Sequence, residues 1–147
     1  MMFEPPSADL STQFLSTVTN QLYIWDVLKE TEPVRRWQAQ GQPLINCARW
    51  SPHAPQTLIV TGGNDRSLSI MDCRSGDVVW YTENAHWRPV RDAQFSTFIP
   101  FWLASTGEDC FVNIWDIRFM HHAPVAKIDG HDGVINKVSS DQLTHLA

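Results

Sequence analysis

Three stretches of this chain end in nearly the same way and at nearly even spacing. They are NQLYIWDV at 20–27, RSLSIMDCR at 66–74 and CFVNIWDIR at 110–118. The aspartates near their ends, Asp26, Asp72 and Asp116, are 46 and then 44 positions apart. Such a repeat constrains the fold more strongly than any local pattern, because each copy must form the same unit and stack on its neighbours.

Each repeat reads as a set of short β-strands. Residues alternate between two faces over 45–50 and over 111–115, which is the period of a strand. Turn signals such as SPHAP, GGNDRS, RSGD and GED separate the runs, and no segment has a sustained helical period. A repeat of about 45 residues that ends in Trp-Asp is typical of the four-stranded blade of a β-propeller.

The sequence therefore predicts an all-β fold, a WD-repeat β-propeller fragment with about two full blades and partial flanking blades. We expect blades over 14–138, between an irregular N-terminal segment at 1–13 and an irregular tail at 139–147. The expected order is a partial blade at 14–40, a degenerate blade at 41–84, a full blade at 85–129 and the first strand of a further blade at 130–138. Because a closed propeller has about four to eight blades, we expect a truncated or partial copy of a longer protein.

One group of residues suggests catalysis. Cys110 follows Asp109, and His86 lies upstream, so the three could act as nucleophile, orienting acid and base. A reactive thiol needs an electropositive and partly exposed setting, and the carboxylates around Cys110 do not supply one. We therefore favour a structural role and expect no enzymatic activity and no catalytic residues.

The same residues resemble the pattern of the WD-repeat family. In that family a His before the first strand, a Ser or Thr on the second, an Asp in the next turn and a Trp on the third form a hydrogen-bond chain. The resemblance implies that His86, Ser105, Asp109 and Trp115 form this structural tetrad. The Trp-Asp positions fall on Trp25-Asp26, Met71-Asp72 and Trp115-Asp116.

The preceding blade departs from this pattern. Thr61 and Asp65 keep their positions, but Met71 replaces the Trp and Gln40 stands near the His position. We expect that its hydrogen-bond network cannot form. The blade then depends on packing by a set of apolar side chains, which are Trp50, Ile59, Ile70 and Trp80.

Composition excludes several other classes. The formal net charge is −5, with 11 Lys and Arg against 16 Asp and Glu, which argues against nucleic-acid binding. No apolar run approaches the roughly 18 residues of a membrane span, and residues 1–12 lack the pattern of a secretory signal. The three cysteines favour a reducing compartment. We expect a cytoplasmic protein without membrane insertion.

Histidines form the only candidate for a metal site. His121 and His122 are adjacent in a predicted turn, with His86 and His131 elsewhere in the last repeats. Adjacent histidines in a turn are usually solvated, and the sequence has no zinc-ligand spacing or phosphate-binding glycine loop. We therefore predict no metal and no cofactor.

A more specific resemblance rests on several consecutive motifs. They are RWSPH at 49–53, ENAH at 83–86, VRDAQF at 90–95, WLASTGEDCFVNIWDIR at 102–118 and PVAKIDGH at 124–131. Their order and spacing are similar to the EARP and GARP complex-interacting protein family. The resemblance implies a non-catalytic scaffold that binds vesicle-tethering complexes, peripherally at endosomes and the trans-Golgi network, in endosomal recycling and retrograde traffic.

An alternative function rests on LASTGEDCFVNIWDIR at 103–118. This stretch resembles the DWD box of WD-repeat substrate receptors for cullin-RING ubiquitin ligases, although Ala104 departs from the pattern. The resemblance implies that Asp116 and Arg118 face a ligase adaptor. The structural interpretation is that both are exposed residues of an ordinary blade.

Overall fold

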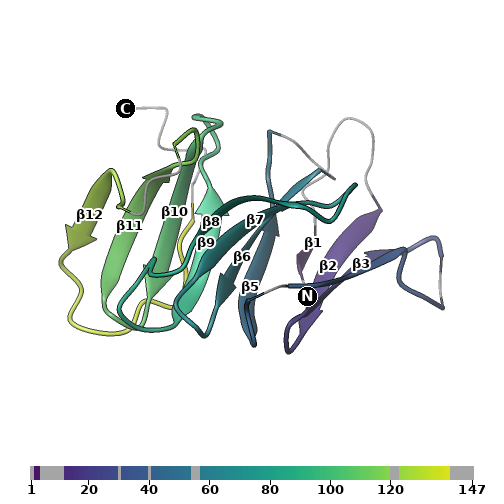
Figure 1. Ribbon diagram of the computed structural model, residues 1–147, viewed down its shortest axis with the longest axis horizontal. Helices are drawn as coiled ribbons and strands as arrows, with labels where there is room; N and C mark the ends of the chain where they lie inside the picture. The colour runs from purple at the N-terminus through teal and green to yellow at the C-terminus, as the bar shows by residue number, and fades with distance from the viewer. Residues whose placement is uncertain are drawn as a thin grey trace.

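The computed structural model describes residues 2–3, 12–29, 31–39, 41–53, 57–119 and 123–139. Within these ranges every regular element is a β-strand, and the strands form three antiparallel sheets of four. The sheets stand side by side in chain order, as blades do in a propeller (Figure 1). The all-β prediction is confirmed. No helix in the described part is long and apolar enough to cross a membrane.

The first sheet contains β1 (Met2–Phe3), β2 (Gln13–Val18), β3 (Gln21–Asp26) and β4 (Arg35–Gln38), paired in that order. The sequence predicted no regular structure before residue 14, yet β1 pairs with Phe14 and Leu15 of β2. A strand edge offers unpaired backbone groups, and two residues of chain are enough to cover part of it. A two-residue strand is too short to show an alternating pattern, which explains why the sequence did not reveal it.

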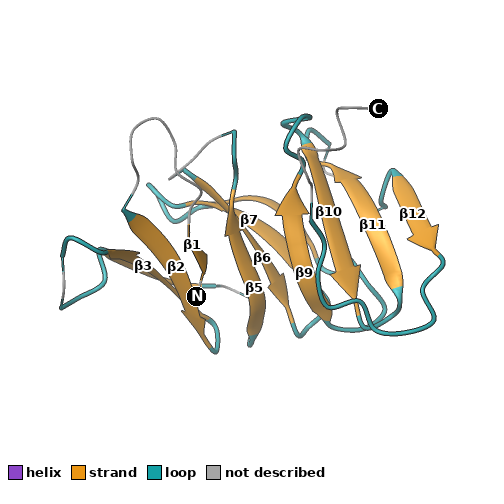
Figure 2. Cartoon of the chain, turned by 180° about the vertical axis from the view of Figure 1, so that it is seen from behind, coloured by secondary structure: helices purple, strands orange, loops and turns teal. Residues whose placement is uncertain are grey.

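The other two sheets are built in the same way. The second contains β5 (Ile45–Trp50), β6 (Leu58–Gly63), β7 (Leu68–Asp72) and β8 (Val78–Thr82). The third contains β9 (Val90–Phe95), β10 (Trp102–Gly107), β11 (Phe111–Asp116) and β12 (Ala126–Asp129). Consecutive strands pair in both sheets, so each is a simple meander. The view from behind shows β9, β10, β11 and β12 side by side in this order (Figure 2).

The core lies between the sheets, in two apolar clusters. The second sheet contributes to both, because neighbouring residues of a strand point to opposite faces. Ile59 of β6 therefore packs toward the first sheet, whereas Val60 packs toward the third. Burial on both faces makes the second sheet the central layer of the molecule. The outer strand β12, in contrast, is exposed along its whole length.

Residues 130–138 differ from the prediction. The sequence predicted that a strand begins there, but the structure shows no strand between 130 and 139. A strand forms only where a neighbouring chain segment pairs with its backbone, and no described segment does so here. Instead, the Val138 backbone N–H donates a hydrogen bond to the Asp92 carboxylate at 3.0 Å.

Candidate functional site

The structure brings the four predicted tetrad residues together in the third sheet. His86 lies in the loop before β9, and its Nδ1 is 3.0 Å from each carboxylate oxygen of Asp109, in the β10–β11 turn. Its Nε2 is 2.8 Å from Ser105 Oγ on β10. Trp115 on β11 donates its indole N–H to the same oxygen at 2.9 Å. The result is one chain of hydrogen bonds from the turn to the core.

Neutral histidine satisfies every partner in this chain. His86 Nδ1–H then donates to Asp109, while Nε2 accepts the Ser105 hydroxyl proton and the Ser105 oxygen accepts from the indole. Burial lowers the pKa of His86 below its usual value, and the attraction of Asp109 offsets this only in part. Protonation would also remove the acceptor that Ser105 needs. We propose that these four residues hold the blade together.

This pKa shift predicts how stability changes with pH. Between the lowered folded-state pKa and the unfolded value of about 6.5, the unfolded chain binds more protons at His86. The free energy of unfolding should therefore fall as pH drops below about 6.5, by at most about 1.4 kcal/mol per pH unit from this residue. Urea unfolding between pH 7.5 and pH 5 measures the effect.

The matched control is His86→Gln, which keeps a hydrogen-bonding side chain but cannot titrate. The other histidines are common to both proteins, so subtracting the two pH profiles isolates His86. The pKa values of Asp26 and Asp72 are lowered from 3.8, so these carboxylates change the free energy of unfolding only near and below pH 3.8, outside the tested range. Identical pH profiles for the two proteins would show that His86 titrates alike in the folded and unfolded states.

Hydrogen bonds link Ser105 to His86 and His86 to Asp109, as in the Ser-His-Asp triad of a hydrolase, but these residues are not accessible to a substrate. Ser105 is 0% exposed and its oxygen already accepts the indole N–H, so no substrate reaches it. Both ring nitrogens of His86 are engaged, and neither remains to take a proton from Cys110. Cys110 itself lies in the β10–β11 turn with φ of 70°. The geometry favours architecture over nucleophilic catalysis.

The second sheet also contains a buried network, contrary to the prediction that none can form. Thr61 Oγ1 donates to Gln42 Oε1 at 2.7 Å, and Gln42 Nε2 donates to Ser67 Oγ at 2.9 Å. The Ser67 hydroxyl in turn donates to Asp65 at 2.6 Å. Gln42 thus takes the place of the histidine, and Ser67 extends the chain to the aspartate.

The error came from the register of the repeat. Gln42 is 44 residues before His86, and the same offset relates Thr61 to Ser105, Asp65 to Asp109 and Met71 to Trp115. Gln40, the residue assigned from the sequence, lies outside the described residues. Applying one constant offset to all four positions would have identified Gln42.

The Trp-Asp positions have a shared local role. The carboxylates of Asp26, Asp72 and Asp116 each accept the backbone N–H two residues later, at 2.9–3.0 Å. Each aspartate therefore closes the turn that follows its third strand. In the first sheet, Trp25 donates its indole N–H to Ser16 Oγ at 2.7 Å, as Trp115 does to Ser105.

Asp116 and Arg118, the residues of the alternative function, pair with each other. Arg118 Nη2 is 2.7 Å from Asp116 Oδ2, and its guanidinium lies 3.7 Å from the centre of the Phe101 ring. Arg74 and Asp72 make the same pair one repeat earlier. Because the arrangement repeats with the blade, the ligase interpretation gains no support from it.

Among the described residues, no group of three or more His, Cys, Asp and Glu side chains is placed to hold a metal ion. His121 and His122 lie outside the described residues. His86 is engaged in the tetrad, with Asp109 on one side of its ring and Ser105 on the other.

Comparisons with known proteins agree with this architecture. The WD domain, G-beta repeat model matches residues 31–72 and 79–116. EARP and GARP complex-interacting protein 1 of Homo sapiens is 32% identical over 140 residues, covering 89% of this chain and 36% of that protein. The EARP-interacting protein homolog of Gekko japonicus is 31% identical over 144 residues, covering 92% and 37%. Nuclear distribution protein PAC1 of Candida tropicalis is 28% identical over 101 residues, covering 67% and 20%.

The chain thus spans little more than a third of the length of the first two relatives. The similarity to EARP and GARP complex-interacting protein 1 confirms the resemblance drawn from the motifs. The family model covers more than half of the chain, and its two matches end at Asp72 and Asp116, the last residues of β7 and β11. The chain belongs to the WD-repeat family of the WD domain, G-beta repeat type.

Proposed function

We propose that this chain is a non-catalytic scaffold that binds vesicle-tethering complexes of the EARP and GARP type. The observation that carries the proposal is the 32% identity to EARP and GARP complex-interacting protein 1, which extends over 89% of the chain. On this proposal the protein is cytoplasmic, associates peripherally with endosomes and the trans-Golgi network, and acts in endosomal recycling and retrograde traffic.

The geometry supports a binding role rather than a catalytic one. The polar networks of the second and third sheets are buried, so they are engaged in holding the blades. Interaction must then use exposed side chains, and Trp87 is the most exposed of the tryptophans at 73%. Its ring meets Phe111 edge-on at 6.2 Å, and Lys127 lies over both rings at 4.6 and 4.1 Å. An exposed tryptophan of this kind is typical of a binding hot spot.

Affinity purification of the tagged protein, followed by mass spectrometry, tests the proposal. We expect subunits of the EARP and GARP complexes to be retained by the unmodified protein. Trp87→Ala should reduce retention more than tenfold if Trp87 is a hot spot. This variant keeps the hydrogen bond from the residue 87 backbone N–H to Asp109, so the fold should be unaffected.

The matched control is Val79→Ala, which removes an exposed apolar side chain from β8 of the second sheet. It should retain the tether subunits at the unmodified level. Absence of these subunits from the purified material would contradict the proposed function, whereas equal losses in both variants would contradict the role of Trp87. A cullin adaptor that is retained by the unmodified protein and lost from Arg118→Ala would support the alternative function instead.

A further inference from the structure

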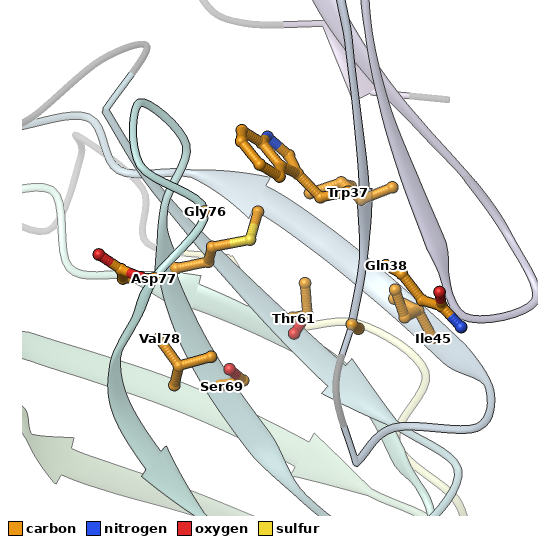
Figure 3. A pocket seen from close by; sticks show the side chains of 11 residues that line it. Trp37, Gln38, Ile45, Thr61, Ser69, Gly76, Asp77 and Val78 are labelled. Atoms are coloured by element: carbon orange, nitrogen blue, oxygen red, sulfur yellow. The ribbon is translucent and has the colours of Figure 1, made fainter.

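A cavity of about 200 Å³ lies between the first and second sheets (Figure 3). Its walls include Leu22 and Trp37 from the first sheet and Thr61, Met71 and Val78 from the second. Val78 is half exposed and lies on the outer strand β8, so the cavity is reached from solvent on that side. The indole N–H of Trp37 is buried and has no hydrogen-bond partner among the described residues.

The cavity exists because two side chains are smaller here than in the next blade. With the offset of 44 residues, Met71 corresponds to Trp115 and Ser69 to Asn113. In the third sheet, Trp115 packs edge-on against Trp80 with ring centres 5.8 Å apart. Asn113 reaches further and donates to the Ala85 carbonyl at 2.8 Å. Met71 and Ser69 both line the cavity, which therefore marks the place that an indole occupies one blade later.

A hydrogen-bond acceptor for an indole is also in place. In the first sheet, the Ser16 hydroxyl oxygen on β2 accepts the indole N–H of Trp25. In the third sheet, the Ser105 hydroxyl oxygen on β10 accepts the indole N–H of Trp115. Thr61 holds the equivalent position in the second sheet and donates its proton to Gln42. Its oxygen keeps a lone pair, and no described side chain donates to it. Thr61 therefore presents an acceptor to the cavity, and Trp37, whose indole lines the same cavity, does not donate to it.

We propose that this cavity binds an indole ring, which donates its N–H to Thr61 Oγ1 and packs against Met71 and Trp37. The thioether of methionine makes favourable contacts with aromatic rings. The volume is sufficient, because an apolar cavity of about 150 Å³ already binds benzene. The ring comes either from a free indole compound or from a tryptophan side chain of a bound protein. The proposal is independent of the proposed function, since it rests on the offset of the repeat, the cavity and the Thr61 hydroxyl.

Titration of 5-fluoroindole with the protein, followed by ¹⁹F NMR, tests the inference. A ring of this size should bind with a Kd on the order of 1 mM. As a competitor, 1-methylindole has nearly the same shape but no N–H, and it should bind about fivefold more weakly than indole. Met71→Trp fills the cavity and should weaken binding at least tenfold. If circular dichroism shows that Met71→Trp does not fold, Ser69→Asn is used in its place, because the larger side chain narrows the same cavity.

Trp87→Ala is the control for stacking of the probe on the exposed aromatic surface, and its Kd should equal that of the unmodified protein. N-acetyltryptophanamide stands for a tryptophan residue in a protein chain. If its Kd is equal to or below that of indole, the natural occupant is a tryptophan side chain of a bound protein. If its Kd is more than tenfold higher than that of indole, the natural occupant is a free indole compound. Three results would overturn the inference. The first is no saturable binding of 5-fluoroindole up to about 10 mM, which is tenfold above the expected Kd. The others are unchanged binding to Met71→Trp or Ser69→Asn, and binding of 1-methylindole as tight as that of indole.

Discussion

Replacing Trp115 by Phe is expected to lower the free energy of unfolding by about 2–4 kcal/mol. The change removes the indole N–H that Ser105 Oγ accepts, and Ser105 is fully buried. It also leaves space beside Trp80, because a phenyl ring is smaller than the indole that packs there. A lost buried hydrogen bond and a new cavity each destabilise a fold, and here both occur at one position.

Met71→Leu is the matched control at the equivalent position of the second sheet. It exchanges two apolar side chains of similar volume and removes no hydrogen bond, so it should cost less than about 1.5 kcal/mol. Urea unfolding of both variants measures the difference as a change in midpoint at constant slope. Equal costs at the two positions would show that the hydrogen bond between Trp115 and Ser105 does not stabilise the blade.

The second large effect is expected at the contact between β5 and β9. Asp92 is buried, and its carboxylate accepts two hydrogen bonds from Arg49, at 3.1 and 2.9 Å. It also accepts the Val138 backbone N–H at 3.0 Å. Asp92→Ala leaves these donors without their acceptor. Removing one partner of a buried ion pair costs about 3–5 kcal/mol, and we expect the lower end because the Arg49 side chain is 24% exposed.

Arg74→Ala is the comparison, because its pair with Asp72 is at the surface and the Arg74 side chain is 69% exposed. Surface pairs of this kind contribute about 0–1 kcal/mol. A double-mutant cycle of Asp92→Ala with Arg49→Ala separates the pair from the other contacts of Asp92. A coupling energy near zero in that cycle would show that the ion pair does not join the second and third sheets.

Much of the fold could be predicted because the repeat is visible in the residues themselves. The Trp-Asp positions and the alternating runs were sufficient for the all-β blades, and the motifs of the last full repeat located the four tetrad residues in the sequence. The strand β1 and the segment at 130–138 could not be predicted in the same way. Whether a short segment becomes a strand depends on which sheet edge it meets, and a single run of residues does not contain that information.

The buried network of the second sheet was missed for a different reason. Its sequence differs from the expected pattern at two positions, Gln42 for His and Met71 for Trp, and only an exact offset aligns Gln42 with His86. The cavity beside Met71 is a three-dimensional consequence of that same departure. It requires Trp37 from another sheet, which no pattern within one repeat could have placed opposite Met71.

The central claim is that the buried hydrogen-bond chain of the third sheet, which ends in the indole N–H of Trp115, holds that blade together. Hydrogen exchange at the indole N–H groups, followed by NMR of protein with ¹⁵N-labelled tryptophan, tests it most directly. The indole N–H of Trp115 donates to the Ser105 hydroxyl, and that of Trp80 donates to the Phe119 backbone carbonyl, so both should exchange slowly. Trp87 is exposed and should exchange within the dead time. Exchange of Trp115 as fast as that of Trp87 would contradict the account.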